Sequence, residues 1–343
     1  MNLGIRRART RMIWQLVVAL AMPAFAMAGP AQTAPKQGRA KTNGKARAKP
    51  GTAQDNAAAA VEDDSSMDDK ARESVEPGRK YVYKVSGGQP QELEVYFPSG
   101  WDPSKNRAPG VMMFHGGGWS GGNLSQFRYA CQYFASRGLV AATANYRMLT
   151  AESKKSLPEG ESRKRVCIID AKSAIRWMKQ HAAELGVDPK RIIVGGGSAG
   201  GHLAVLANIN TDLNDPNDPK GIDAKAIAFL LFNPAFTLDG KDHDNQVDVF
   251  PLLKPGLAPS IMFFGTKDRW KNSADVLVKK IKEQGDETSL WTAEGQGHSF
   301  FNRQPWYDLA LIEADRFLVA HGLLSGPCVI APPKSGEKLV KAE

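Results

Sequence analysis

The stretch RIIVGGGSAGGHLAVLANI, residues 191–209, joins an apolar, β-branched run to a helix-forming run through a cluster of glycines. Ser198 lies at the junction, in the sequence Gly196-Gly197-Ser198-Ala199-Gly200, which matches the pattern G-x-S-x-G. A nucleophile on a strained strand-to-helix turn needs small neighbours, because a flanking Cβ atom would collide with the adjoining backbone. The stretch therefore predicts a buried strand, a sharp turn that carries a nucleophilic serine, and a helix whose N-terminus faces that serine.

The same pattern occurs a second time in the chain, so the surrounding sequence has to show which serine is the nucleophile. In Gly118-Trp119-Ser120-Gly121-Gly122, the serine lies several residues beyond the preceding apolar run, and Gly122-Asn123 still separates it from the next helical segment. A serine in that place cannot occupy a tight strand-to-helix turn. We therefore predict that Ser198 is the nucleophile and that Ser120 is not.

Glycines also follow an earlier apolar run, in His115-Gly116-Gly117-Gly118-Trp119. Three consecutive glycines free the backbone to turn its N–H groups toward a ligand, as an oxyanion hole requires. A merely flexible glycine loop is the alternative. A phosphate-binding loop is excluded, because the lysine and the spacing of G-x-x-x-x-G-K-[ST] are missing. Among the histidines, we expect His115 and His202 to hold these glycine segments by hydrogen bonds.

Short β-rich runs alternate with helical segments from Tyr81 onward, which predicts an α/β fold with a mostly parallel sheet and helices on both faces. The first two runs read as an antiparallel pair. The predicted strands are 81–85, 92–97, 108–115, 139–146, 191–196, 226–233, 260–265 and 288–293, and the predicted helices are 125–137, 165–185, 199–209, 272–284 and 306–321. Residues 326–343 are predicted to be a tail.

A serine nucleophile needs a base, and an imidazole, which titrates near neutral pH, is the usual one. His298 follows the last predicted strand, at the sheet edge where sites of open α/β folds gather. The acid that orients this base should come from another loop at the same edge. Asp268, after the strand 260–265, fits that position, and Asp275, within the following helix, is the alternative.

At this point the chain resembles the α/β-hydrolase family, in its hormone-sensitive-lipase-like and small bacterial carboxylesterase branches. The resemblance spans about residues 80–325 and rests on five motifs: HGGGW (115–119), NYR (145–147), DPKRIIVGGGSAGGHLA (188–204), GTKD (265–268) and EGQGHSFF (294–301). It implies an α/β-hydrolase fold with a minimal cap, and an oxyanion hole formed by the amides of Gly117, Gly118 and Ala199. Many hormone-sensitive-lipase-like members carry Asp where this chain has Gly197. That departure favours bacterial esterases that act on acetyl or feruloyl groups of plant polysaccharides.

The net charge of +9 belongs to the N-terminus. Residues 1–54 contain ten Lys or Arg and no acidic residue; removing these ten from the 45 Lys and Arg of the chain leaves 35, against 36 Asp and Glu. The remainder is thus neutral, which argues against a nucleic-acid partner. Hydrophobic residues at 42% of the 343 are enough to bury a core.

The N-terminal residues are expected to serve export. Residues 1–28 place four arginines before an apolar run that ends in Ala26-Met27-Ala28, the layout of a signal peptide, and predict a periplasmic or extracellular protein. An uncleaved anchor is the alternative. Residues 29–79, rich in Lys, Ala and Pro and then acidic, predict a disordered linker, whose basic part could instead contact a surface weakly.

Cysteine and histidine usage predicts neither a disulfide scaffold nor a metal site. With three cysteines, Cys131, Cys167 and Cys328, at most one internal bridge can form, and Cys131 with Cys167 is the favoured pair. His243 lies among aspartates, but a solvated loop is the simpler interpretation. We expect no metal and no cofactor.

The substrate predicted from these features is a small-molecule or carbohydrate ester with a short acyl chain. About 25 residues separate the strand ending near Asn233 from the next one, too few for a large cap, and a poorly covered site favours small acyl groups. Trp119 and Phe300 are candidates to line the pocket, with core packing as the alternative. Amidase, formamidase or peptidase activity on the same fold, and an inactive binding protein, remain as alternative functions, and the sequence leaves the oligomeric state open.

Overall fold

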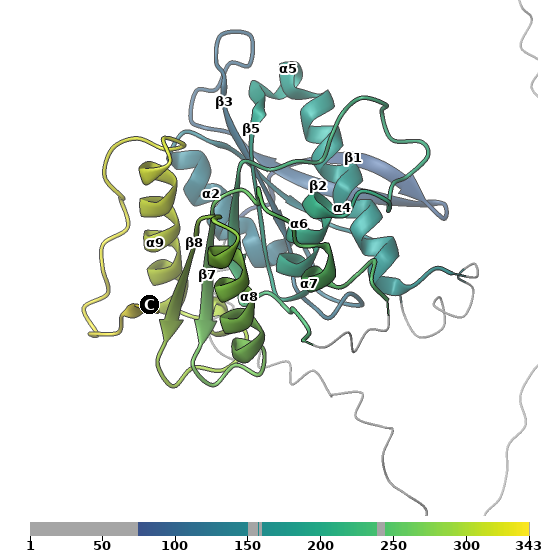
Figure 1. Ribbon diagram of the computed structural model, residues 1–343. Helices are drawn as coiled ribbons and strands as arrows, with labels where there is room; N and C mark the ends of the chain where they lie inside the picture. Colours follow the sequence, from purple (N-terminus) through teal and green to yellow (C-terminus); the bar gives the residue numbers. More distant parts are fainter. Residues whose placement is uncertain (1–74, 150–156, 158–159, 239–243, 343) are drawn as a thin grey trace, which may run out of the picture. The chain divides into compact units, whose positions relative to one another are not determined.

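The computed structural model describes residues 75–149, 157, 160–238 and 244–342, all of which belong to one compact unit spanning Ala59–Glu343 (Figure 1). The predicted signal peptide and almost all of the predicted linker lie outside the described residues, as does His243. Within the described ranges, no helix combines the length and the apolar character that a membrane crossing demands.

Nine strands of the described chain form one sheet in the order β1-β2-β4-β3-β5-β6-β7-β8-β9. Strands β3 to β8 are parallel to one another, whereas β1 and β2 at one edge and β9 at the other run antiparallel to their neighbours. The strands are β1 (Arg79–Ser86), β2 (Gln89–Tyr96), β3 (Ala108–Phe114), β4 (Val140–Ala144), β5 (Val187–Gly197), β6 (Ala228–Phe232), β7 (Ser260–Gly265), β8 (Thr288–Ala293) and β9 (Leu339–Ala342).

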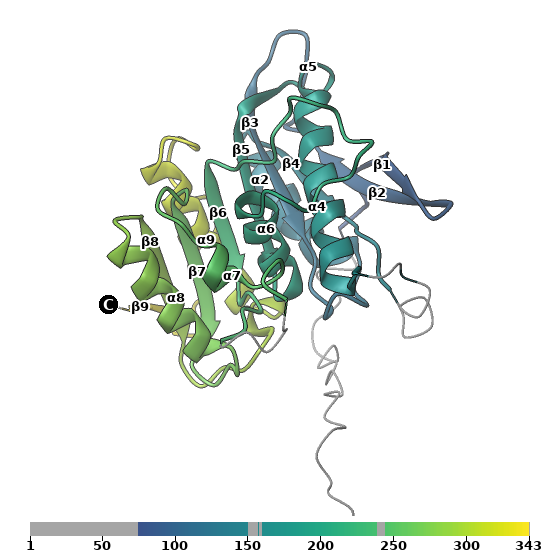
Figure 2. The same cartoon turned by 45° about the vertical axis from the view of Figure 1, so that its right-hand side comes forward.

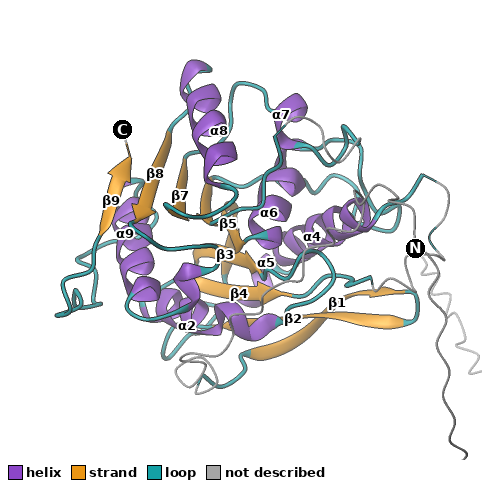
Figure 3. Ribbon diagram, turned by 90° about the horizontal axis from the view of Figure 1, so that it is seen from below, coloured by secondary structure: helices purple, strands orange, loops and turns teal. Residues whose placement is uncertain are grey.

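Helices cover both faces of the sheet, as Figures 2 and 3 show. One face carries α2 (Arg128–Ser136), which follows the 3₁₀ turn η1 (Leu124–Phe127), and α9 (Trp306–Ala320), which follows the 3₁₀ turn η2 (Phe300–Asn302). The other face carries α4 (Arg163–Gln180), α5 (Ala182–Leu185), α6 (Ala199–Ile209), α7 (Val249–Leu252) and α8 (Lys271–Glu283). The chain therefore has the predicted α/β-hydrolase architecture.

Burial explains why the central strands are continuous apolar runs. All residues of β3, β4, β6 and β7 are buried, because helices pack on both of their faces. The two faces support separate hydrophobic clusters. Because the strands are buried on both faces, the polar groups of the site lie where the parallel strands end, at the carboxyl edge of the sheet.

The C-terminal residues differ from the prediction of a tail over 326–343. Leu339–Ala342 form β9, which pairs antiparallel with β8, and Leu339 is buried. The segment is short and only its first residue is buried, so no apolar pattern marks it in the sequence. Its pairing with β8 covers the backbone groups that this strand would otherwise expose at the edge of the sheet.

The favoured disulfide between Cys131 and Cys167 is wrong, since all three cysteines are free. Cys131 lies on α2 and Cys167 on α4, and the two helices pack against opposite faces of the sheet. Burial raises the pKa of both thiols, which keeps them protonated and unreactive.

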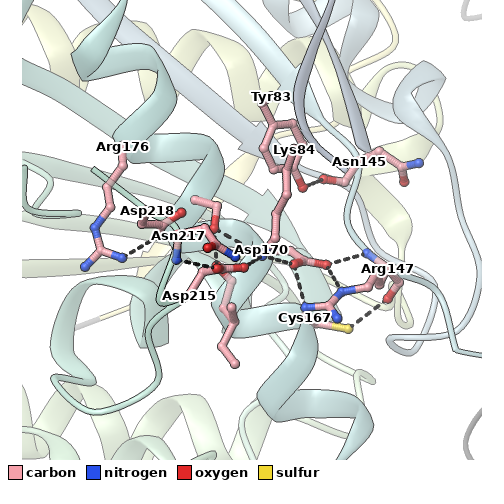
Figure 4. A network of polar contacts seen from close by, with 12 residues as sticks. Tyr83, Lys84, Asn145, Arg147, Cys167, Asp170, Arg176, Asp215, Asn217 and Asp218 are labelled. Atoms are coloured by element: carbon pink, nitrogen blue, oxygen red, sulfur yellow. Dashed lines mark hydrogen bonds and ion pairs between the residues drawn. The ribbon is translucent and has the colours of Figure 1, made fainter. Parts of the chain in front are cut away.

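A buried carboxylate ties the first strand to the loop that follows β4 (Figure 4). Asp170 on α4 is fully buried; it accepts two hydrogen bonds from the Arg147 guanidinium, at 2.7 and 2.8 Å, and one from the Arg147 backbone amide at 3.0 Å. Lys84 of β1 lies 2.8 Å away and also pairs with Asp215. This cluster holds Arg147 in place, and with it the two residues before it, which reach the site.

Removal of the Asp170 carboxylate is expected to destabilise the fold strongly. Asp170→Ala leaves Arg147 and Lys84 without this buried partner, which should lower the free energy of unfolding by about 3–5 kcal/mol in a denaturant titration. Asp223→Ala is the matched control, since Asp223 is largely exposed and pairs with Lys179, and it should cost less than about 1 kcal/mol. Equal losses in the two variants would contradict the importance of the cluster.

Candidate active site

Ser198 stands at the turn between β5 and α6 in a strained backbone conformation. Its φ of 48° and ψ of −115° are unusual for a residue with a side chain. The turn is tight because α6 begins directly against the end of β3: a Cβ atom on Gly200 would lie 1.9 Å from the Phe114 carbonyl oxygen. The glycine requirement inferred from the sequence therefore has a specific steric cause.

Ser198, His298 and Asp268 come together from three different strand ends. The Ser198 Oγ atom lies 2.8 Å from His298 Nε2, and His298 Nδ1 lies 2.8 Å from Asp268 Oδ2. The Asp268 side chain is fully buried, whereas 22% of the His298 side chain is exposed. With a proton on Nδ1, the imidazole donates to the carboxylate and accepts from the serine hydroxyl, which is the arrangement that a serine nucleophile and its base require.

The alternative acid, Asp275, lies away from the histidine. It forms an ion pair with Lys271, one turn earlier on α8, and half of its side chain is exposed. Asp268 is held differently, because its Oδ1 atom accepts a hydrogen bond of 2.9 Å from the Trp270 amide. The strand-end position thus puts Asp268, and not Asp275, next to the imidazole.

The glycine loop after β3 presents backbone amides beside the serine. A Cβ atom on Gly116 would lie 3.3 Å from the Ser198 Cβ atom, so the loop and the serine are in direct contact. Gly117 and Gly118 have φ values of 113° and 61°, a region that favours glycine. Among the described residues, no acceptor is bonded to the amides of Gly117, Gly118 or Ala199. These three groups can therefore donate to a ligand oxygen.

The loop is held from behind, as expected for His115. The His115 nitrogen atoms lie 2.7 Å from the Gly116 carbonyl oxygen and 3.0 Å from Asn145 Oδ1, and the ring stacks on Tyr146. The Tyr146 hydroxyl donates to the His115 carbonyl oxygen at 2.8 Å. Burial lowers the pKa of His115, which favours its neutral imidazole. Asn145 and Tyr146 precede Arg147, so the Asp170 cluster supports this loop.

Gly197, the departure from the lipase-like pattern, has a structural reason. A Cβ atom at this position would lie 2.7 Å from the Phe301 ring, which is fully buried between Phe127 and Phe232. An aspartate would have to displace that ring. The buried Phe301 ring therefore requires a residue without a side chain at position 197.

The two predicted pocket residues have different environments. Trp119 is partly exposed; its indole donates to His202 Nδ1 at 3.3 Å, and the Lys164 ammonium lies 4.2 Å from its ring centroid. Phe300 is fully buried and packs against Phe301 and Trp306. The structure thus places Phe300 in the core, and Trp119 alone of the two has an exposed surface.

Asn233 contacts the histidine and was not singled out in the sequence. It follows β6, has a φ of 35°, and is fully buried with its Nδ2 atom 3.3 and 3.4 Å from the two ring nitrogens of His298. Similar distances to both nitrogens mean that the amide lies over the ring. Its position at the carboxyl end of a parallel strand was the one signal available.

The described part of the chain contains no group of three or more His, Cys, Asp or Glu side chains arranged to hold a metal ion. The polar groups at the carboxyl edge instead contact one another directly. The chemistry that this arrangement offers is proton transfer between Ser198 and His298 beside a set of backbone donors.

Comparison with known proteins agrees with this architecture. The family described as BD-FAE matches residues 93–233. The chain is 36% identical over 218 residues to the probable carboxylic ester hydrolase LipM of Mycobacterium tuberculosis, covering 63% of this chain and 41% of that protein. It is 35% identical over 119 residues to carboxylesterase NlhH of the same organism, covering 34% of each chain. The chain thus spans less than half the length of these relatives.

Among solved structures, the apo form of Thermogutta terrifontis esterase 2 superposes with a TM-score of 0.67 at 36% identity, covering 74% of this chain and 97% of that one. The chain belongs to the α/β-hydrolase family. The similar proteins within it carry the names of carboxylic ester hydrolases and esterases.

The two serines in G-x-S-x-G patterns allow a matched test. Ser198→Ala removes the hydroxyl bonded to His298 and should lower kcat for an activated acetate ester on the order of 10⁴-fold or more. Ser120→Ala removes an exposed hydroxyl and should leave kcat within about twofold, since surface changes are usually small. Labelling by a fluorophosphonate should disappear only in Ser198→Ala. A similar loss in both variants would contradict the assignment.

Proposed function

We propose that the protein hydrolyses carboxylic esters through an acyl-enzyme on Ser198, with His298 as general base and Asp268 as the acid that orients it. The observation that carries the proposal is the line of two 2.8 Å hydrogen bonds from the Ser198 hydroxyl through His298 to the buried Asp268 carboxylate. The unbonded amides of Gly117, Gly118 and Ala199 beside that line support it.

In the first half-reaction, the Ser198 Oγ atom attacks the ester carbonyl carbon while its proton passes to His298 Nε2. The carbonyl oxygen becomes negatively charged and accepts hydrogen bonds from the amides of Gly117, Gly118 and Ala199. Asp268 stabilises the imidazolium. His298 then gives the proton to the leaving alkoxy oxygen, the C–O bond breaks, and the alcohol departs.

In the second half-reaction, water takes the place of the alcohol. His298 removes a proton from the water molecule, the resulting hydroxide attacks the acyl carbon, and the oxyanion forms again at the same amides. Collapse of this intermediate returns the proton from His298 to Ser198 Oγ and releases the carboxylic acid. The enzyme is then in its starting state.

Short acyl chains are the substrate class that we propose. The described part of the segment between β6 and β7 contains one four-residue helix, α7, which is too little for a large lid. The similar Thermogutta terrifontis esterase 2 has been solved with propionate and with butyrate bound. Both observations support acids of two to four carbons over long-chain lipids.

A series of p-nitrophenyl esters tests this substrate class. The value of kcat/KM should be highest among the acetyl, propionyl and butyryl esters and about tenfold or more lower for the palmitoyl ester, because a shallow site cannot bury a long chain. Matched anilides should be cleaved far more slowly than the esters. A maximum at palmitoyl would contradict the short-chain proposal, and equal rates on anilides would favour an amidase.

Export is a further part of the proposed function, supported by the arginine-rich and then apolar residues 1–28. An exported esterase with an open site would meet acylated carbohydrate polymers, and we propose their acetyl or feruloyl groups as natural substrates. Release of acetate or ferulate from an acylated xylan, absent in Ser198→Ala, would support this proposal. A mature protein whose mass still includes residues 1–28 in the cytoplasmic fraction would contradict export.

A further inference from the structure

Gln126 occupies a junction that the mechanism above does not use. It belongs to η1, between the glycine loop and α2, and is partly buried. Cβ atoms added to Gly116 and Gly197 would lie 3.5 and 3.4 Å from the Gln126 Oε1 atom. A single side chain therefore lies against both the glycine loop and the turn that carries Ser198.

The Gln126 carboxamide bonds in two directions. Its Oε1 atom accepts a hydrogen bond of 2.6 Å from the Gly116 amide, and its Nε2 atom donates to Asn302 Oδ1 at 3.1 Å. The orientation of the carboxamide is determined, because a backbone N–H can only donate. The Tyr307 hydroxyl also donates to the Gln126 carbonyl oxygen at 2.8 Å, which anchors the main chain of the residue to α9.

The first bond decides which amides face the substrate. Because the Gly116 N–H group donates to Gln126, it is not free to donate to a substrate oxygen, whereas no acceptor among the described residues is bonded to the amides of Gly117 and Gly118. An oxyanion donor is effective only when it is oriented in advance. Three glycines in a row give the loop many other conformations, so a side-chain anchor at its first glycine has a physical purpose.

The second hydrogen bond, to Asn302, connects Gln126 to the loop that carries His298. Asn302 is the last residue of η2, four positions after His298, and the intervening Ser299 has a left-handed φ of 63°. Gly116, Gln126 and Asn302 thus connect the oxyanion loop to the histidine loop through two hydrogen bonds. The glycine loop and His298 come from opposite sides of β5, and this connection joins them.

We infer that Gln126 is a positioning residue that sets the oxyanion donors relative to His298. It acts through the Gly116 amide and through Asn302, and it takes no part in bond making. The inference rests on the proposed function, since it concerns the transition state of ester hydrolysis at Ser198.

The first experiment removes both bonds while keeping the size of the side chain. Gln126→Leu should lower kcat about 10- to 100-fold for both acetyl and butyryl p-nitrophenyl esters, with KM within about threefold, because the donors bind the transition state more strongly than the ground state. The rate of fluorophosphonate labelling should fall in parallel. Gln132→Leu, an exposed glutamine on α2, is the matched control and should keep the wild-type kcat.

The second experiment tests the connection itself by exchanging amides for acids. Gln126→Glu still accepts from Gly116, and a rotated Asn302 amide can donate to its second oxygen, so kcat should stay within about threefold. Asn302→Asp alone still accepts from Gln126 and should do the same. Q126E/N302D places two carboxylates across a contact of 3.1 Å, and its kcat should be about tenfold or more below either single variant.

Several results would overturn the inference. A wild-type kcat in Gln126→Leu would do so, as would a loss that lies wholly in KM or that differs between the two esters, which would indicate direct substrate contact. An additive double variant would show that the two loops are not connected through this pair. Thermal unfolding of each variant separates a folding defect from a loss in the folded enzyme. Failure of the proposed function is distinguishable, because wild-type protein would then be as inactive as Ser198→Ala.

Discussion

The geometry of the site depends on how closely two backbone segments approach each other. The first turn of α6 lies against the end of β3 so tightly that Gly200 has no room for a Cβ atom beside the Phe114 carbonyl oxygen. This approach forces the chain to reverse at Ser198 in a strained conformation, and it brings Ser198 next to the glycine loop that follows β3. A similar approach joins the segments that carry Asp268 and His298, since a Cβ atom on Gly265 would lie 2.1 Å from the Gln296 carbonyl oxygen. The site therefore depends on glycine, which has no side chain, at these two positions.

The rest of the structure stabilises this strained turn. Fully buried strands and two hydrophobic clusters hold the sheet rigid, while the polar groups are confined to its carboxyl edge. Each of these groups is supported by a neighbour that is not itself reactive: Asp268 by the Trp270 amide, and the glycine loop by His115 and Tyr146. His115 is fully buried, which favours its neutral form, whereas the His298 side chain is partly exposed. The two histidines of the site are therefore suited to different tasks.

Much of the fold was predictable because its signals are local. The apolar runs of β3, β6 and β7 and the glycine cluster around Ser198 can be recognised within a few residues of sequence, and the structure has these elements within a few positions of the predicted bounds. The errors came from contacts between distant residues. The four residues of β9 become a strand only because β8 offers a free edge, and Cys131 and Cys167 are separated by a sheet that the spacing of cysteines cannot reveal.

The same division applies to the site. The sequence by itself determined the residue types of the candidate site, since a serine between glycines, a histidine after the last parallel strand and an aspartate after the one before it each belong to a local motif. It also determined the three consecutive glycines of the loop after β3. Only the tertiary structure decided that Asp268 and not Asp275 reaches His298, that Phe300 packs in the core, and that Gln126 joins the glycine loop to Asn302. The physical reason is that hydrogen bonds act over about 3 Å, and which side chains meet at that distance depends on how strands far apart in the sequence are placed side by side.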